Sequence, residues 1–68
     1  MELKQLSYFV AVAEEGSITA AARRLYISQP PLSTQMKLLE QELGCQLFER
    51  GRSAIRLTEQ GAILYRHA

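Results

Sequence analysis

Residues 28–44, SQPPLSTQMKLLEQELG, decide the fold. We expect one helix here, because proline is tolerated in a first turn and Gly44 stands just past the end, where helices commonly stop. Apolar residues recur at helical spacing and predict one buried stripe, made of Leu32, Met36, Leu39 and Leu43. The opposite face is neutral to basic and has no acid before Glu40. Such a helix is suited to insertion into a DNA groove.

The composition is that of one small globular domain. The 68 residues are near the lower limit for a self-supporting core, and an apolar fraction of 47% argues against disorder. The single Cys45, expected to be a small buried residue, excludes an intramolecular disulfide. With the single His67 it provides no metal cluster, so neither a metal nor a cofactor is expected. The chain shows no membrane-spanning run and no signal-peptide pattern in MELKQLSYF, which favours a cytoplasmic location.

The charges are unevenly distributed, although the net charge is only +1. Two stretches carry only positive ionised residues, namely Arg23, Arg24 and Lys37 between positions 16 and 39, and Arg50, Arg52 and Arg56 between positions 50 and 58. If these stretches lie side by side, one face of the domain attracts phosphate. Composition alone leaves open the alternative that they are ordinary solvated charges.

Two helices are predicted before residue 28. The first covers residues 2–15, ends at Gly16, and has a core stripe at Leu3, Leu6, Phe9, Val10 and Ala13. Tyr8 and Val12 lie off that stripe, and each can pack against another helix or a partner. The second, Ile18 to Leu25, follows the N-cap Ser17.

A tight connection is predicted between the second helix and residue 28. It contains Tyr26 and Ile27, and Ser28 is the expected N-cap of the next helix. For Tyr26 we expect packing within the domain or, alternatively, a hydrogen bond to a phosphate.

The sequence after Gly44 predicts a small hairpin and a last helix. The segments CQLFER and SAIRL read as two short strands, with an exposed tip at residues 50–53. Because a lone ribbon is marginal in water, its apolar residues must pack on the helices; these are Leu47, Phe48 and Leu57. Thr58 is the expected N-cap of the last helix.

Helix, tight turn, helix and basic hairpin in this order predict a mainly α fold, a winged helix-turn-helix. It has a three-helix core, a short two-stranded wing and the start of a linker helix. The helix-turn-helix covers residues 18–37, the wing about residues 46–57, and the DNA-binding domain residues 1–58. A major groove admits one helix, whose amino-terminal side chains reach base edges while the preceding helix lies over the backbone.

Each exposed residue of this arrangement has an expected role on double-stranded DNA. The base-reading residues are expected to be Gln29, Pro30, Pro31, Ser33 and Thr34. Gln29 can pair with adenine or use its amide on other base edges, and the prolines can touch a thymine methyl group. Phosphates are expected to meet Arg23, Ser28 and Lys37. In the wing we expect contacts from Arg50, Arg52 and Ser53, with Arg52 suited to the narrow minor groove.

The chain from residue 6 to residue 61 also closely resembles the amino-terminal DNA-binding domain of LysR-type transcriptional regulators. The motifs that carry the resemblance are Ala21-Ala22, Leu25, Ser28-Gln29-Pro30, Leu32-Ser33, Leu39-Glu40, Leu43-Gly44, Leu47-Phe48, Arg50, and Leu57-Thr58 with Gly61. The resemblance implies a bacterial, nucleoid-associated regulator that binds pseudo-palindromic promoter sites as a homodimer. It implies a linker helix, residues 59–68 here, with dimer contacts at Ile63 and Leu64. It also implies an effector-binding domain for a small molecule, absent from these residues.

Two positions depart from the family pattern. Many members carry Arg at the position of Thr34, so one contact is weaker or missing here. Many also place the wing Arg at the position of Ser53, which leaves open whether Arg52 is the residue that enters the minor groove.

Other classes of function have less support. An enzyme is not expected, because the sequence holds no paired acid, base and nucleophile and no Gly-rich phosphate loop. A helical protein-interaction module without DNA binding is the alternative. It suits the apolar last helix but does not explain the acid-free segments.

Overall fold

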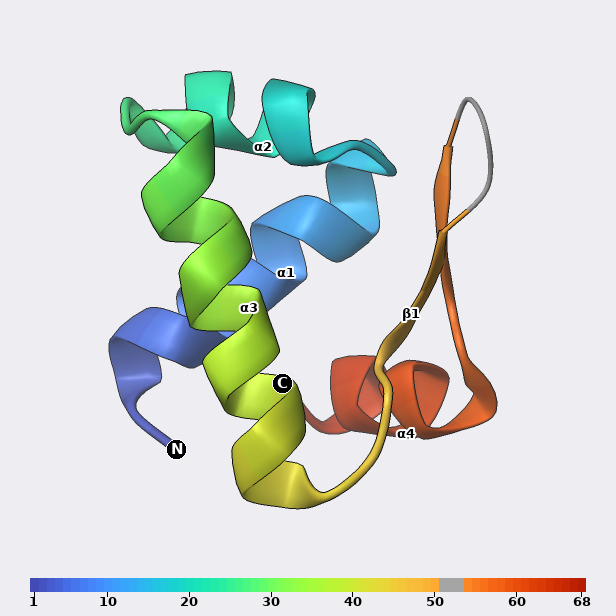
Figure 1. Ribbon diagram of the computed structural model, residues 1–68. Coiled ribbons are helices and arrows are strands. Elements are labelled where there is room, and N and C mark those ends of the chain that lie inside the picture. Colours follow the sequence, from blue (N-terminus) through green and yellow to red (C-terminus); the bar gives the residue numbers. More distant parts are fainter. Residues whose placement is uncertain (51–53) are drawn as a thin grey trace.

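The computed structural model describes residues 1–50 and 54–68. Its elements, in order, are α1 (Leu3–Glu15), α2 (Ile18–Leu25), α3 (Gln29–Leu43), β1 (Phe48–Arg50), β2 (Ile55–Leu57) and α4 (Glu59–His67). Figure 1 shows α2 across one end of α1 and α3, with the β1–β2 hairpin and α4 beside this three-helix unit. The predicted winged helix-turn-helix is therefore confirmed. No described helix has the length and apolarity needed to cross a membrane.

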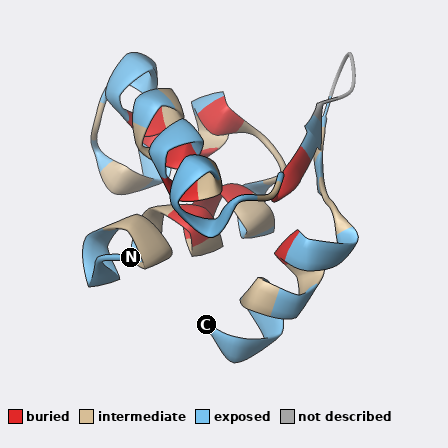
Figure 2. Ribbon diagram, turned by 60° about the horizontal axis from the view of Figure 1, so that its bottom comes forward, coloured by how far each residue is buried: buried red, intermediate tan, exposed pale blue. Residues whose placement is uncertain are grey.

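The core lies where α1, α2, α3 and β1 meet, as the buried residues in Figure 2 show. The most deeply buried large side chains are Phe9, Val12, Leu32, Met36, Leu39 and Leu47. The Phe9 and Phe48 rings, with centroids 5.4 Å apart, join α1 to the hairpin. Small residues on α2, Ala21 and Ala22, are also buried in this cluster and permit the close approach of its neighbours.

The expected stripes are corrected at their ends. Leu3 is 87% exposed and Leu43 is 40% exposed, whereas Val12, which lies off the predicted stripe, is fully buried in the core. Leu3 and Leu43 are the first and last residues of their helices, and the buried cluster lies toward the helix centres. Helical spacing fixes which residues share a face but does not say how far along that face the neighbours reach. Cys45, expected to be buried, is half-buried against the core.

Three helices end at a residue with left-handed backbone geometry. Gly16 (φ 67°) and Gly44 (φ 70°) follow α1 and α3, as predicted, and Tyr26 (φ 58°) follows α2. For a residue with a side chain, this geometry costs about 1–2 kcal/mol. The Tyr26 side chain does not recover that cost by packing, because it is 95% exposed. The expectation that Tyr26 packs within the domain is therefore wrong.

The hairpin is antiparallel, and its strands are shorter than the predicted segments. Phe48 pairs with Leu57, and Arg50 pairs with Ile55. The Ile55 N–H donates to the Gly16 carbonyl at 3.0 Å, which attaches β2 to the connection between α1 and α2. The burial of Phe48 and the half-buried position of Leu57 confirm that the hairpin packs on the helices.

A second set of contacts fixes the start of α4 beneath the hairpin. The Thr58 hydroxyl accepts from the Gly61 N–H at 3.0 Å, so Thr58 is the N-cap as predicted, and it donates to the Gln46 carbonyl at 2.6 Å. The Thr58 N–H donates to the Leu47 carbonyl at 3.0 Å. Gly61 is buried against that carbonyl, and a Cβ there would lie 2.1 Å from its oxygen. Only glycine fits at this position without a shift of the backbone.

Candidate DNA interface

The turn between α2 and α3 lies at one end of the molecule (Figure 1). All the predicted base contacts and two of the predicted phosphate contacts, Arg23 and Ser28, belong to this turn and the helix ends beside it. Two backbone hydrogen bonds close this turn, from the Tyr26 N–H to the Arg23 carbonyl at 3.2 Å and from the Ile27 N–H to the Ala22 carbonyl at 3.0 Å. This is the Schellman arrangement, in which the residue after the turn commonly packs on the helix. Ile27 does so, since it is half-buried against the core. We call residues 23–34 the recognition end.

Ser28 stands at the N-cap of α3, but its side chain makes no capping hydrogen bond. A capping oxygen accepts from the N–H of the second or third helical residue. Those residues are Pro30 and Pro31, and neither has an N–H. The expectation that Ser28 caps through its side chain is therefore wrong. The exposed Ser28 hydroxyl is left for a partner from outside the domain.

Gln29, the first residue of α3, is exposed and is oriented by α2. The Thr19 hydroxyl lies 3.4 Å from Gln29 Oε1 and donates to it. This contact leaves the Gln29 Nε2 group with both its donors and the oxygen with a second lone pair. An amide in that state can meet the paired donor and acceptor of an adenine edge.

The remaining predicted base-reading residues lie along the first turns of α3. Pro30, Pro31 and Thr34 are exposed, and Ser33 is half-buried. Lys37 lies one turn beyond Ser33, is exposed, and is therefore further from the recognition end. These four residues and Lys37 lie away from the side of α3 that is buried in the core, which carries Leu32, Met36 and Leu39.

The two basic residues of α2 are both exposed and differ in their ion pairs. Arg24 pairs with Glu14 at 2.8 Å and with Glu15 at 3.3 Å. The hydrogen bond from Arg24, followed by one from the Tyr65 hydroxyl, lowers the pKa of the Glu14 carboxyl. Arg23 is exposed and makes no ion pair with any residue that the structure describes.

Only part of the predicted wing interface lies within the residues that the structure describes. Arg50 is the last residue of β1, and Arg56 is exposed in β2. Arg52 and Ser53 lie outside the described residues, so their roles in the minor groove stay predictions.

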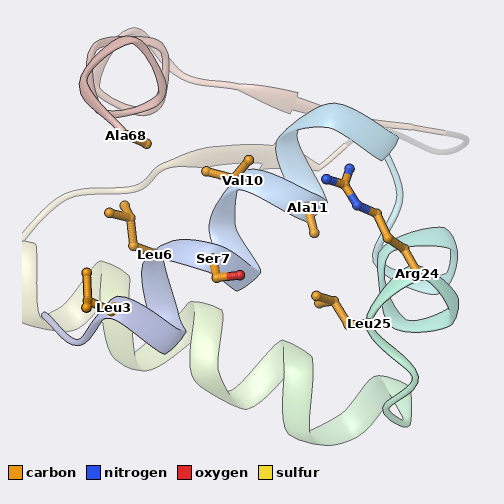
Figure 3. Close-up of a pocket in the computed structure, with 8 residues that line it drawn as sticks. All are labelled: Leu3, Leu6, Ser7, Val10, Ala11, Arg24, Leu25 and Ala68. Carbon is orange, nitrogen blue, oxygen red and sulfur yellow. The ribbon is translucent and has the colours of Figure 1, made fainter.

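The two predicted dimer residues of α4 have different surroundings. Ile63 is 45% exposed, whereas Leu64 is half-buried and packs on the core of its own domain. A cavity of about 330 Å³ lies between α1, α2 and the end of α4 (Figure 3). Its lining is mostly apolar and includes the exposed Leu3, but none of the predicted base-reading residues.

Three residues with a clear role in this geometry were missed or misplaced by sequence reasoning. Thr19 orients Gln29, and Tyr26 is held outward at the turn. Glu40 was counted only as a surface acid and a family motif residue, yet its Oε2 accepts from the Leu47 N–H at 2.7 Å and the Phe48 N–H at 3.3 Å. It thus joins the third helix to the wing. The Leu39-Glu40 motif was the one sequence signal for this role.

Comparison with known proteins gives consistent matches over nearly the whole chain. The family described as "Bacterial regulatory helix-turn-helix protein, lysR family" matches residues 3–62. The HTH-type transcriptional regulator ClcR of Pseudomonas putida is 61% identical over 61 residues, which cover 90% of this chain and 21% of ClcR.

Solved structures of protein–DNA complexes match equally well. The BenM_DBD/catB site 1 DNA complex is 54% identical, with a TM-score of 0.95, and the match covers 98% of this chain and 74% of that one; BenM is a regulator of Acinetobacter baylyi. The CbnR_DBD-DNA complex is 49% identical, with a TM-score of 0.95 and coverages of 98% and 77%. The chain spans about a fifth of the length of the curated relatives it matches.

Proposed function

Because the chain belongs to the lysR family of bacterial regulatory helix-turn-helix proteins, we propose that it binds double-stranded DNA sequence-specifically and regulates transcription. The recognition end enters the major groove and the wing lies at the minor groove. The observation that carries this proposal is the front of α3, where Gln29 and Thr34 are exposed and the hydroxyl of the N-cap Ser28 makes no capping hydrogen bond. Structures of two similar domains in complex with DNA support it.

Within this interface we propose separate roles for two groups of residues. Gln29, Ser33, Thr34 and the two prolines read bases, while Arg23, Ser28 and Lys37 contact phosphates. The Thr19 contact supports the first assignment, because it favours one orientation of the exposed Gln29 amide before DNA arrives. Arg23 and Lys37 are exposed and make no ion pair with a described residue, which supports the second.

We also propose the assembly and setting in which the domain works. Two copies bind pseudo-palindromic sites as a homodimer through residues 59–68, with the exposed Ile63 as the contact that α4 best offers. Leu64 contributes less, since it already packs on its own core. In the longer protein, a further domain binds a small-molecule effector, and the protein acts in the cytoplasm at the nucleoid. The alternative of a protein-interaction module leaves the acid-free face unexplained.

The test is selection of bound duplexes from random DNA, followed by titration of the enriched duplex at several salt concentrations. We expect an enriched sequence, and an affinity that falls steeply as salt rises, because each contacted phosphate releases counterions. Failure to enrich any sequence, or binding that does not change with salt, would contradict the proposal and favour the interaction module.

A further inference from the structure

Tyr26 is the most exposed of the large apolar and aromatic side chains that the structure describes. Its exposed fraction is 95%, against 37% for Tyr65. An aromatic ring in this position adds nothing to the core of the domain. Packing within this domain therefore does not explain why an aromatic side chain occupies this position.

The backbone of Tyr26 also has a geometry that is unusual for tyrosine. Its φ of 58° and ψ of 40° lie in the left-handed region, which side chains rarely adopt. The helix ends at residues 16 and 44 have the same geometry, and both carry glycine. Tyrosine thus occupies a position where glycine fits better, and the described residues give its ring no place in the core.

The turn also fixes the backbone from which the ring projects. Tyr26 and Ile27 donate the two Schellman hydrogen bonds, and Ile27 is packed on the core. Because this backbone is fixed, the Cα–Cβ bond of Tyr26 is directed outward before DNA binds, and only the side-chain rotamers remain to be ordered.

The neighbours of Tyr26 are suited to an anion. Arg23 lies three residues before it and Ser28 two residues after it, and both are exposed. Two residues span at most about 7 Å, so a phosphate held by Ser28 is within reach of a tyrosine side chain at position 26. The segment from residue 16 to residue 39 contains no acid that would repel the anion.

We propose that Tyr26 is an additional DNA contact, whose hydroxyl donates a hydrogen bond to a phosphate oxygen beside the N-terminus of α3. The proposal rests on the proposed function and extends its interface into the turn. Tyrosine is among the residues that contact the DNA backbone, and such contacts position a protein without reading sequence. Because the side chain is neutral, it adds affinity without releasing a counterion, in contrast to Arg23.

The experiment compares Tyr26→Phe, Tyr26→Gly and Arg23→Ala with the unmodified chain. Each is titrated, from about 50 to 200 mM salt, with the duplex enriched from random DNA and with a random duplex. Tyr26→Phe is expected to bind both duplexes about tenfold more weakly, with the same slope of log affinity against log salt. Arg23→Ala is expected to flatten that slope by about one. Tyr8→Phe, which removes the same hydroxyl from α1 outside the recognition end, is the matched control and is expected to bind as the unmodified chain does.

Tyr26→Gly separates binding from folding. Glycine adopts the left-handed geometry without strain, so the variant should bind DNA more weakly without a lower melting temperature. If Tyr26→Phe and Tyr26→Gly bind both duplexes as tightly as the unmodified chain while Gln29→Ala loses its preference for the enriched duplex, the Tyr26 contact is refuted and the proposed function stands. If no duplex is enriched, both are refuted.

Discussion

Two regions of this domain use polar groups in opposite ways. At the junction of the hairpin with α3 and α4, which we call the hairpin junction, Glu40 and Thr58 satisfy backbone groups of the chain itself. At the recognition end, the Ser28 hydroxyl makes no capping hydrogen bond, because the residues that would donate an N–H to it are prolines. The Tyr26 side chain there is exposed. The first region stabilises the position of the wing relative to α3. The second leaves hydrogen-bonding groups to an outside partner, so we expect its variants to change binding with little effect on folding.

The largest expected effect is that of Gly61→Ala in the hairpin junction. Helix propensity alone predicts that alanine stabilises α4 by about 1 kcal/mol. The added Cβ would meet the Leu47 carbonyl oxygen at 2.1 Å, so backbone must move, and we expect a loss of more than about 3 kcal/mol in the free energy of unfolding. Urea unfolding measures this loss.

Gly44→Ala is the matched control for that change. Its backbone is left-handed, but nothing lies within 4 Å of the added Cβ. We expect it to cost only about 1 kcal/mol, from strain. A Gly61→Ala variant as stable as the unmodified chain would show that the junction is not closely packed.

Glu40→Ala should have the next largest effect. The substitution leaves the N–H groups of Leu47 and Phe48 without their acceptor, and both residues are buried. An unsatisfied buried donor costs about 1–3 kcal/mol. Urea unfolding should show this loss for Glu40→Ala, while Gln41→Ala, at an exposed position of the same helix, should change little. Equal effects of the two variants would argue against the role of Glu40 in holding the wing.

At the recognition end, Gln29→Ala and Ser33→Ala should lower discrimination and leave stability unchanged. A good base contact contributes about 1–3 kcal/mol of discrimination. We therefore expect weaker binding to the enriched duplex and nearly unchanged binding to a random one, measured by competition titration. Thr19→Val, which removes the donor that orients Gln29, should lose part of the same discrimination. An equal loss on both duplexes would move Gln29 and Ser33 from base reading to phosphate contact.

Lys37→Ala should have a smaller and different effect on binding. A phosphate contact carries no sequence information, so the enriched and random duplexes should be affected alike. Removing one such contact should reduce the slope of log affinity against log salt by about 0.9. A loss confined to the enriched duplex would instead place Lys37 among the base-reading residues.

The same contrast explains which features could be predicted from sequence. Helical period placed Leu32, Met36 and Leu39 correctly, because a buried stripe depends on spacing alone. The role of Glu40 depends on backbone N–H groups seven and eight residues further on, and no periodic pattern encodes that distance. The failure of Ser28 as a side-chain cap follows from rules already visible in the sequence, since prolines have no N–H. The outward position of Tyr26 depends on the backbone geometry of the turn, which spacing does not give.

The smallest expected effect belongs to a cluster that links the two regions. Glu14 of α1 accepts from Arg24 of α2 and, at 2.9 Å, from the Tyr65 hydroxyl of α4. These contacts lower the pKa of Glu14 from its ordinary value of 4.5. A carboxyl with a lowered pKa in the folded state stabilises the fold above pH 4.5, and the contribution is lost as pH falls through the lowered value.

Glu14→Gln should therefore lower the melting temperature slightly at neutral pH, because the cluster is exposed and solvent screens it. The difference from the unmodified chain should shrink as pH falls below 4.5 and vanish in stronger acid. Melting curves at several pH values measure it, with Glu59→Gln as a control at an exposed acid of α4 that makes no ion pair with a described residue. A difference that does not change with pH would mean that Glu14 acts through packing and not through its charge. In that case Arg24 is free to turn toward DNA, and the division between the two regions is less sharp than the geometry indicates.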